Sequence, residues 1–241
     1  MSFLMRVADS RWGWFLQGLP SWPRAAAMFR IRLATMTTPA RCRLLWEQCG
    51  KIFGERVPGA FVECGVWRGG SAALMALAAQ HAGQEREFHL FESIAGLPDP
   101  SAADDAASIA YSGGKSSGQL VSIGECVADV SEVQKFFFEE LRLDRARFHF
   151  HIGWFQNTLP VAAPNIGAIA LLRLDGDWYE STKVCLEYLY PQLARGGIVI
   201  LDDYFAWKGC HDATEEYRAR HGITTPIMRI DGAAAYWVKE A

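Results

Sequence analysis

The 241-residue sequence lacks several features that would define whole classes of protein. It has no apolar stretch near the roughly 20 residues that a membrane-spanning helix needs. It has no run of lysine and arginine, and its net charge of −3 argues against nucleic acid or an anionic membrane as the main partner. The first residues mix Phe3 and Leu4 with Arg6 and Asp9, which does not favour a secretory signal. Its six cysteines have neither paired nor metal-ligand spacing, so we expect reduced thiols in a cytoplasmic protein.

What the sequence does contain is a regular alternation of short apolar runs and helical patterns. Half of the residues are apolar, which is enough for one sizeable core. We expect strands at 60–64, 88–91, 148–152, 168–174 and 198–201, and helices at 40–53, 71–80, 130–141, 180–193 and 211–221. This order is typical of an α/β fold with a mostly parallel sheet covered on both faces. Two last strands, 226–230 and 234–238, flank Asp231-Gly232 and predict a closing antiparallel hairpin.

Two segments depart from this alternation. Residues 1–55 begin rich in tryptophan and arginine, and we expect a helical arm there, followed by one domain over 56–241. The arm carries a set of aromatic residues, Trp12, Trp14, Phe15 and Trp22. They favour contact with a partner subunit, and so a homo-oligomer, or a wall of a ligand pocket. Residues 95–120 are rich in glycine, serine, alanine and aspartate, which predicts a long loop that acts as a lid.

A glycine-rich turn follows the first expected strand. Gly65 and Gly69 let the backbone turn tightly and approach a ligand, and Ser71 can cap the helix whose amides face it. The dinucleotide fingerprint G-x-G-x-x-G is absent, so a pyrophosphate is the weaker reading. The turn favours an amino-acid-like ligand, with Glu63 accepting hydrogen bonds from its ammonium group. A turn of this kind also forms without a ligand.

Two further strand ends carry side chains suited to a nucleoside. Glu92, followed by Ser93, lies about 20 residues past the glycine turn, where a carboxylate accepts the hydroxyls of a ribose. Gly153 and Trp154 follow the 148–152 strand, and the indole can stack on a purine. The alternatives are a solvated charge for Glu92 and packing under the lid for Trp154. An amino acid, a ribose and a base together describe S-adenosylmethionine better than a nicotinamide cofactor.

Acidic residues stand at the ends of two apolar runs. Asp175 and Asp177 follow the fourth expected strand, and Asp202 and Asp203 follow the fifth. On neighbouring strands, about 5 Å apart, these carboxylates repel one another unless a cation is bound. A hard ion such as Mg²⁺ takes oxygen ligands and lowers the pKa of a bound hydroxyl, whose proton a spare carboxylate removes. The aspartates can instead cap a helix or close a turn, and His211 is the rival base.

Several of these motifs together resemble the macrocin O-methyltransferase family. The matching segments are 63–70, 96–98, 153–160, 172–182 and 202–204, within a resemblance that covers about residues 55–240. The most specific part is the run L-R-L-D-G-D-W-Y-E-S-T at 172–182. The family usually shows Asp-Ser-Phe after the second strand, whereas this chain has Glu92-Ser93-Ile94. Glutamate in place of aspartate preserves the ribose-binding chemistry.

The resemblance implies a Rossmann-like class I methyltransferase sheet. It also implies an enzyme that uses S-adenosylmethionine and Mg²⁺ to methylate sugar hydroxyls in macrolide and aminocoumarin biosynthesis. By the same resemblance, Asp175, Asp202 and Asp203 are metal ligands and Asp177 is the general base. Glu92 and the Gly153-Trp154 turn contact the cofactor.

We therefore predict a Mg²⁺-dependent O-methyltransferase that acts on a hydroxyl of a small natural product. A glycoside with neighbouring hydroxyls is favoured because a diol chelates a metal, and a catechol-like acceptor is the variant within this class. Two other classes stay open. A nucleotide-dependent oxidoreductase is disfavoured by the missing glycine fingerprint, and a non-catalytic cofactor-binding protein by the complete set of aspartates.

Overall fold

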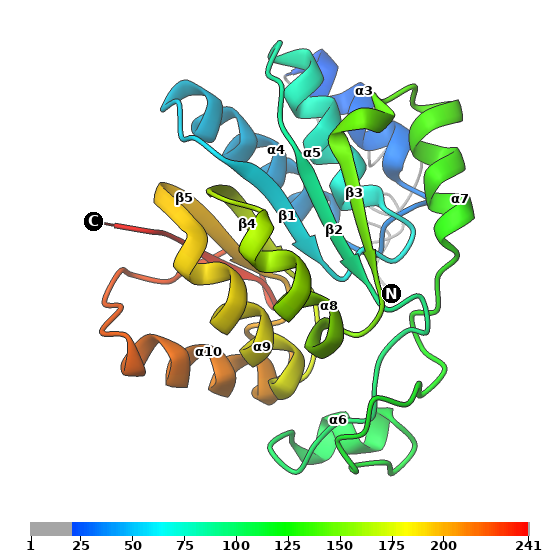
Figure 1. The fold of residues 1–241 in the computed structure, drawn as a ribbon, viewed down its shortest axis with the longest axis vertical. Helices are drawn as coiled ribbons and strands as arrows, with labels where there is room; N and C mark the ends of the chain where they lie inside the picture. Colours follow the sequence, from blue (N-terminus) through cyan, green and yellow to red (C-terminus); the bar gives the residue numbers. More distant parts are fainter. Residues whose placement is uncertain (1–20, 241) are drawn as a thin grey trace, which may run out of the picture.

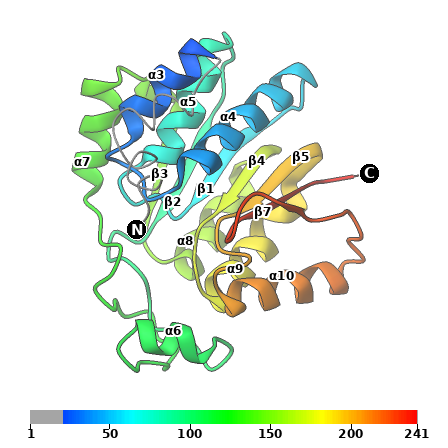
Figure 2. The same cartoon turned by 180° about the vertical axis from the view of Figure 1, so that it is seen from behind.

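The computed structural model describes residues 21–240, which form one seven-stranded sheet with helices on both faces (Figures 1 and 2). The strands are β1 (Ala60–Cys64), β2 (Phe88–Glu92), β3 (Phe148–Ile152), β4 (Ile169–Leu174), β5 (Leu193–Leu201), β6 (Met228–Arg229) and β7 (Ala235–Val238). Their order across the sheet is β3-β2-β1-β4-β5-β7-β6. Strands β1 to β5 pair in parallel, and β7 pairs antiparallel with both β5 and β6. The predicted fold class, a parallel sheet with an antiparallel hairpin at its end, is confirmed.

The helices divide between the two faces of this sheet. They are α3 (Trp22–Ile31), α4 (Pro39–Gly54), α5 (Gly70–His81), α6 (Ala106–Tyr111), α7 (Val130–Lys135), α8 (Phe155–Ala162), α9 (Tyr179–Leu189) and α10 (Lys208–Arg220). Short turns of other helix types lie at Phe136–Glu140, Arg145–Arg147, Ala163–Asn165 and Tyr190–Gln192. Helices α3, α4 and α5 cover one face, and α8, α9 and α10 cover the other (Figure 1).

Three sequence-based expectations need correction. The helix expected at 130–141 is an α-helix only as far as Lys135 and continues as a π-helical turn. The expected loop at 95–120 contains the short helix α6. Helix α8 was not expected, because its eight residues include Pro160, and proline removes a hydrogen bond from a helix interior.

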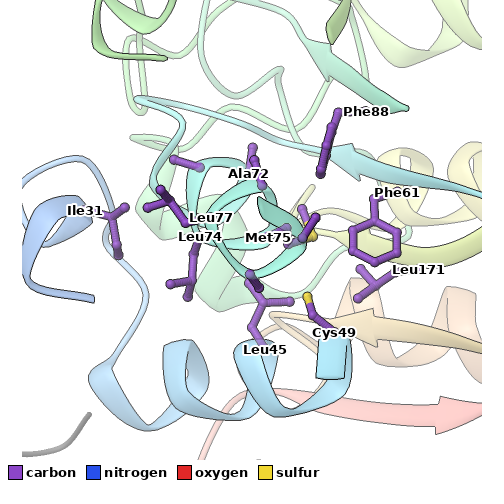
Figure 3. Packing of buried hydrophobic residues seen from close by; sticks show 14 of the residues in the cluster. Ile31, Leu45, Cys49, Phe61, Ala72, Leu74, Met75, Leu77, Phe88 and Leu171 are labelled. Carbon is purple, nitrogen blue, oxygen red and sulfur yellow. The ribbon is translucent and has the colours of Figure 1, made fainter. Parts of the chain in front are cut away.

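Helix α5 forms the centre of the larger core. All of its residues from Gly70 to Ala79 are buried, so it is apolar on every side rather than on one stripe. Its many alanines let α3 and α4 pack closely over it, with Leu74 facing Ile31 and Leu45 (Figure 3). Burial of one such leucine contributes about 1.5–3 kcal/mol. This packing fixes the start of α5, and with it the glycine turn that follows β1.

The segment before β1 belongs to the same core. Residues of α3 and α4, such as Met28 and Cys42, lie in one hydrophobic cluster with α5. The predicted arm aromatics Trp12, Trp14 and Phe15 lie outside the described residues, and Trp22 is 66 % exposed. Within residues 21–240, no helix is both long and apolar enough to cross a bilayer. All six cysteines fall in this part of the chain, and each is a free thiol.

Candidate functional site

A cavity of about 290 Å³ opens where β1, β2, β4 and β5 end. Its wall combines the glycine turn after β1, the end of β2, the aspartates after β4 and β5, part of the 95–120 segment and residues 34–37. This position is where ligands bind in open parallel sheets, because the strand ends leave backbone groups and side chains free. Each of the predicted motifs is therefore at or next to one cavity.

The glycine turn is shaped by its contact with the neighbouring strand end. Gly65 has a φ of +89°, and a Cβ atom there would lie 1.8 Å from the carbonyl oxygen of Asp175. Only glycine fits this approach. Helix α5 begins at Gly70 with Gly69 as its N-cap, so Ser71 lies in the first turn and does not cap the helix as expected. Ser71 lines the cavity.

Glu92 holds this turn in place through the backbone. One carboxylate oxygen, Oε2, accepts hydrogen bonds from Val66 N at 2.8 Å and Trp67 N at 2.7 Å. The other, Oε1, accepts from Ile94 N at 3.0 Å. The longer side chain of glutamate lets the end of β2 reach the turn after β1. Glu92 also lines the cavity, as does its neighbour Ser93.

The aromatic turn after β3 completes this side of the cavity. Gly153 has a φ of +135°, and its N–H donates to Glu92 O at 2.9 Å, which places the turn beside the end of β2. Trp154 follows at the start of α8 and lines the cavity. Glu92, Ser93 and Trp154 thus share one wall.

Glu63 lies behind the cavity wall rather than in it. Its side chain is 1 % exposed, and Oε1 pairs with Arg173 Nη1 at 2.7 Å. Burial raises the pKa of Glu63 to about 8, against the opposing effect of Arg173. In this geometry Glu63 positions Arg173, and Arg173, not Glu63, reaches the cavity wall.

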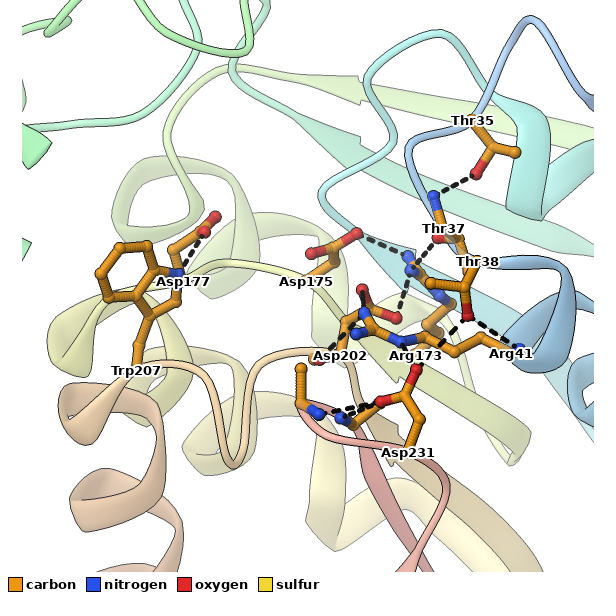
Figure 4. A network of polar contacts seen from close by, with 12 residues as sticks. Thr35, Thr37, Thr38, Arg41, Arg173, Asp175, Asp177, Asp202, Trp207 and Asp231 are labelled. Carbon is orange, nitrogen blue, oxygen red and sulfur yellow. Dashed lines mark hydrogen bonds and ion pairs between the residues drawn. The ribbon is translucent and has the colours of Figure 1, made fainter. Parts of the chain in front are cut away.

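Arg173 is a buried cation that serves several carboxylates at once. It pairs with Glu63, with Asp175 at 2.9 Å and with Asp202 at 2.8 Å. It also donates to Thr37 Oγ1 at 3.1 Å (Figure 4). Burial acts to lower the pKa of Arg173, but the surrounding carboxylates outweigh it and hold the pKa well above its usual range. Arg173 therefore stays charged and neutralises part of the acidic cluster.

A second cation, Arg41 on α4, also pairs with these carboxylates. Arg41 Nη1 pairs with Asp202 Oδ2 at 2.6 Å, and Nε pairs with Asp231 Oδ2 at 2.7 Å. Thr38 caps α4 and also donates to Asp231 at 3.3 Å. The two oxygens of Asp202 are thus each bound to a guanidinium group, Oδ1 to Arg173 and Oδ2 to Arg41 (Figure 4).

The other three predicted aspartates form a cluster of their own. Asp175, Asp177 and Asp203 each offer an oxygen within 4.8 Å of the other two. Asp203 Oδ2 is buried without a hydrogen-bond partner in residues 21–240. Burial, and then the negative charge of Asp177 and Asp175, raises the pKa of Asp203 well above its usual range. An orphaned carboxylate oxygen beside two more carboxylates fits a hard divalent cation.

Asp177 is held in an unusual backbone conformation. Its φ is +57°, in the left-handed region that few non-glycine residues adopt, although aspartate does so more often than most. Trp207 Nε1 donates to Asp177 Oδ1 at 3.0 Å. Burial, followed by the charge of Asp175, raises the pKa of Asp177 to about 7. A carboxylate with such a pKa can take a proton near neutral pH.

The rival base, His211, is not part of this cluster. It lies on α10, where its ring is 4.9 Å from that of Tyr204 and its Nδ1 is 3.1 Å from Asp212 Oδ1. It does not line the cavity. Three residues of the site had no sequence signal: Arg41, Thr37 and Trp207 lie outside the motifs and reach the site only through folding.

Comparison with known proteins agrees with the sequence motifs. Residues 20–239 match the family model described as Macrocin-O-methyltransferase (TylF). The chain is 40% identical over 187 residues to the 8-demethyl-8-(2,3-dimethoxy-alpha-L-rhamnosyl)-tetracenomycin-C 4'-O-methyltransferase of Streptomyces olivaceus, covering 77% of this chain and 68% of that protein. It is 37% identical over 193 residues to the demethyldecarbamoylnovobiocin O-methyltransferase of Streptomyces niveus, covering 79% and 70%.

Solved structures give the same result for the fold. The O-methyltransferase NovP superposes with a TM-score of 0.73 at 35% identity, over 86% of this chain and 83% of that chain. The methyltransferase TomG of Streptomyces achromogenes, in complex with S-adenosylmethionine, shares the fold with a TM-score of 0.56 at 11% identity, over 99% of this chain and 100% of that chain. The chain therefore belongs to the macrocin O-methyltransferase family and is an O-methyltransferase of the S-adenosylmethionine-dependent type.

Proposed function

We propose that this protein is a Mg²⁺-dependent enzyme that transfers the methyl group of S-adenosylmethionine to a hydroxyl of a glycoside with neighbouring hydroxyls. The observation that carries the proposal is the cluster of Asp175, Asp177 and Asp203 at the cavity wall, with one oxygen unpartnered. The names of relatives give support, since they describe O-methyltransferases for a rhamnosyl tetracenomycin and for mycinamicin III.

The metal site is proposed on Asp175 and Asp203 with a third carboxylate. The family resemblance assigns that third place to Asp202 and leaves Asp177 as the base. In this structure both oxygens of Asp202 are engaged by arginines, and an oxygen of Asp177 lies within 4.8 Å of oxygens of Asp175 and Asp203. For Asp202 to be the third ligand, it would have to release one arginine when the metal binds. Bound Mg²⁺ would act as a Lewis acid that lowers the pKa of an acceptor hydroxyl. We retain Asp177 as the base, since Trp207 fixes only its Oδ1.

The cofactor is proposed to lie along the glycine turn, the end of β2 and the turn after β3. Gly65, Gly69 and Ser71 would face its amino-acid part, Glu92 and Ser93 its ribose, and Gly153 and Trp154 its base. The sulfonium supplies an electrophilic methyl group. In the proposed transfer, the acceptor oxygen would form a bond to the methyl carbon as the carbon–sulfur bond breaks, and Asp177 would take the hydroxyl proton. The site's task is to orient and deprotonate the acceptor.

The charges in the cavity favour a neutral acceptor. Among the described residues, the two cations that line it are Arg41 and Arg173, and both are already paired with carboxylates. The wall also carries Glu92 and the aspartates. A nucleoside diphosphate sugar would meet this negative field with no unpaired cationic side chain on the described wall, and the proposed Mg²⁺ would be taken up by the acceptor hydroxyls, so a neutral glycoside is the better fit.

The proposal is tested by transfer of labelled methyl from S-adenosylmethionine to a panel of neutral rhamnosides, with catechol as the alternative acceptor. We expect Mg²⁺-stimulated transfer to a rhamnoside, and Asp203→Asn should lose at least about 100-fold in rate. Full activity in EDTA would contradict the proposed dependence on Mg²⁺. Transfer to catechol alone would show that the acceptor is a catechol-like hydroxyl and not a glycoside. Thermal stabilisation by NAD rather than S-adenosylhomocysteine would favour an oxidoreductase.

The third ligand is decided by calorimetric Mg²⁺ titration of two matched variants. If Asp177 is the base, Asp177→Asn binds Mg²⁺ as the unsubstituted enzyme does but turns over slowly. In that case Asp202→Asn loses Mg²⁺ affinity. The reverse pattern would exchange the two roles.

We also propose a cytoplasmic homo-oligomer, with residues 1–55 as an arm and 56–241 as the methyltransferase domain. Support comes from apolar side chains exposed on the loop after α3: Leu33 is 75 % exposed, and Met36, at the edge of the cavity, is 64 % exposed. Such a surface is typical of a subunit contact. Light scattering on the full chain should give a mass above that of one 26.8 kDa chain, and removal of residues 1–20 should lower it.

A further inference from the structure

Residues 96–125 form a lid whose base is closed and whose tip is attached separately. At the base, Leu97 N donates to Glu125 O, Ile123 N to Leu97 O and Asp99 N to Val121 O, all at 3.0–3.1 Å. These bonds join the two arms of the lid. The tip carries α6 and extends beyond the strand ends, as the lower part of Figure 1 shows. The tip is therefore held by contacts other than those that close the base.

Two hydrogen bonds connect the lid to the body, one at its base and one towards its tip, and both donors come just after Asp177 in the chain. Trp178 Nε1 donates to Pro98 O at 2.9 Å. Tyr179 N, at the first residue of α9, donates to Asp104 Oδ1 at 2.8 Å. The side chain of Asp104 thus caps α9 from a different segment of the chain. Asp104 is 7 % exposed.

The carboxylate of Asp104 is closely surrounded by Ser101 and Gly209. Its Oδ2 accepts from Ser101 N at 2.8 Å and from Ser101 Oγ at 3.1 Å, which fixes the carboxylate within the lid. Gly209 on α10 backs the other oxygen: a Cβ atom at this position would lie 2.0 Å from Asp104 Oδ1 and 2.8 Å from Tyr179 N. The lid, α9 and α10 therefore meet at one point.

The same contacts surround the turn that holds Asp177. The ring of Tyr111, at the end of α6, lies 6.2 Å from that of Trp178 and 5.6 Å from that of Trp207. Trp207 in turn donates to Asp177. The lid therefore contacts, through Tyr111, the tryptophan that binds the left-handed Asp177.

We propose that Asp104 is a positioning residue that couples docking of the lid to the conformation of Asp177. With Asp104 on Tyr179 N, the lid is docked, Tyr111 closes the cavity and the Asp177 turn is held. When this contact opens, the tip swings on its closed base, the acceptor can enter, and the Asp177 turn relaxes. The role of Asp177 as base rests on the proposed function, whereas the docking contact does not.

Backbone hydrogen exchange on the full chain tests the coupling without any acceptor. Asp104→Ala and Gly209→Ala break the same contact from opposite sides. Both should raise exchange in the peptide 176–182 about tenfold or more, because Tyr179 N loses its acceptor. Asp104→Asn keeps an oxygen for Tyr179 N and should change less. The matched control is Asp105→Ala, which removes the adjacent carboxylate that caps only α6. It should loosen 105–112 and leave 176–182 protected.

Turnover gives the second reading. Asp104→Ala and Gly209→Ala should lower kcat about tenfold, while affinity for S-adenosylhomocysteine stays within about twofold. If Asp104→Ala and Gly209→Ala leave the amides of 176–182 as protected from exchange as Asp105→Ala does, the docking role of Asp104 is overturned. Raised exchange with unchanged kcat would overturn the coupling to Asp177. An unsubstituted enzyme inactive on the whole acceptor panel would count against the proposed function alone, and the exchange data would still decide the docking.

Discussion

The acidic site has two halves, and the negative charge of the carboxylates is balanced differently in each. In one half, Glu63, Asp202 and Asp231 are paired with Arg173 and Arg41. In the other half, Asp175, Asp177 and Asp203 cluster with one oxygen of Asp203 unpartnered, and Asp175, at the boundary of the two halves, also pairs with Arg173. Asp202 and Asp203 are adjacent in sequence and fall in different halves. A carboxylate's role is therefore set by the cation that reaches it, and the second half is where the proposed metal ion would complete the charge balance.

The largest effect is expected from removing the buried cation of the paired half. Arg173→Met would leave three carboxylates without their shared partner, and loss of one partner from a buried ion pair costs about 3–5 kcal/mol. Urea unfolding measures this change in the free energy of unfolding. Arg195→Met, an exposed arginine on β5, is the control and should change it little. A loss for Arg173→Met as small as that of the control would show that the paired half does not stabilise the fold.

Replacing the two neighbouring aspartates should change stability in opposite directions. The raised pKa of Asp203 means that ionising it in the metal-free fold costs stability as pH rises above about 4. Asp203→Asn should therefore raise the midpoint temperature at pH 7 by a few degrees, about 2–4 °C per kcal/mol. Asp202→Asn should lower it, because contacts with Arg41 and Arg173 weaken.

Addition of Mg²⁺ sharpens this pair of measurements. The unsubstituted protein should gain thermal stability with Mg²⁺, and Asp203→Asn should gain less, since ligands that bind only the folded state stabilise it. Calorimetric scans with and without the metal check both steps. If the two variants shift together, the division into two halves is wrong.

A smaller effect is expected at the rim of the paired half. The pKa of Asp231 is lowered to about 2: burial acts to raise it, but hydrogen bonds from Arg41, Ala233 and Ala234 outweigh burial. A lowered carboxyl pKa gives stability that is complete above about pH 4 and is lost as pH falls towards 2. Because the group is partly solvated, we expect only about 1 kcal/mol.

Asp231→Asn measures this contribution. Its unfolding free energy should lie below that of the unsubstituted protein at pH 5, and the gap should narrow at pH 3. A gap that stays constant with pH would assign the contribution to the hydrogen bonds of the turn rather than to the charge.

Most of the sheet could be predicted from the sequence because its strands are short apolar runs. Strands β1 and β3 match their expected ranges, since each run is bounded by residues that break it. Helix α8 was not predicted because Pro160 disfavours a helix locally. In the folded chain, the packing of its Leu159 against the sheet outweighs that cost. Local pattern fails where tertiary burial overrides it.

The site was predicted unevenly for a related reason. Strand-end residues such as Glu92 and Asp175 lie in motifs, so their position at the cavity followed from the fold. The cap by Ser71 was wrong because the left-handed Gly69 ends the turn two residues earlier than Ser71 would require. Arg41 and Trp207 could not be found, because nothing near them in the sequence records what they contact.

By itself, the sequence determined the family, the parallel sheet and the gathering of its acidic residues at one edge. The reason is that the alternation of strands and helices along the chain and the spacing of motifs are local properties of the chain. The tertiary structure alone decided how those acids divide. Arg41 meets Asp202 from 161 positions away, and Asp104 meets Tyr179 from 75 positions away. Charge neutralisation and capping depend on distance in space, and only the folded chain sets that distance.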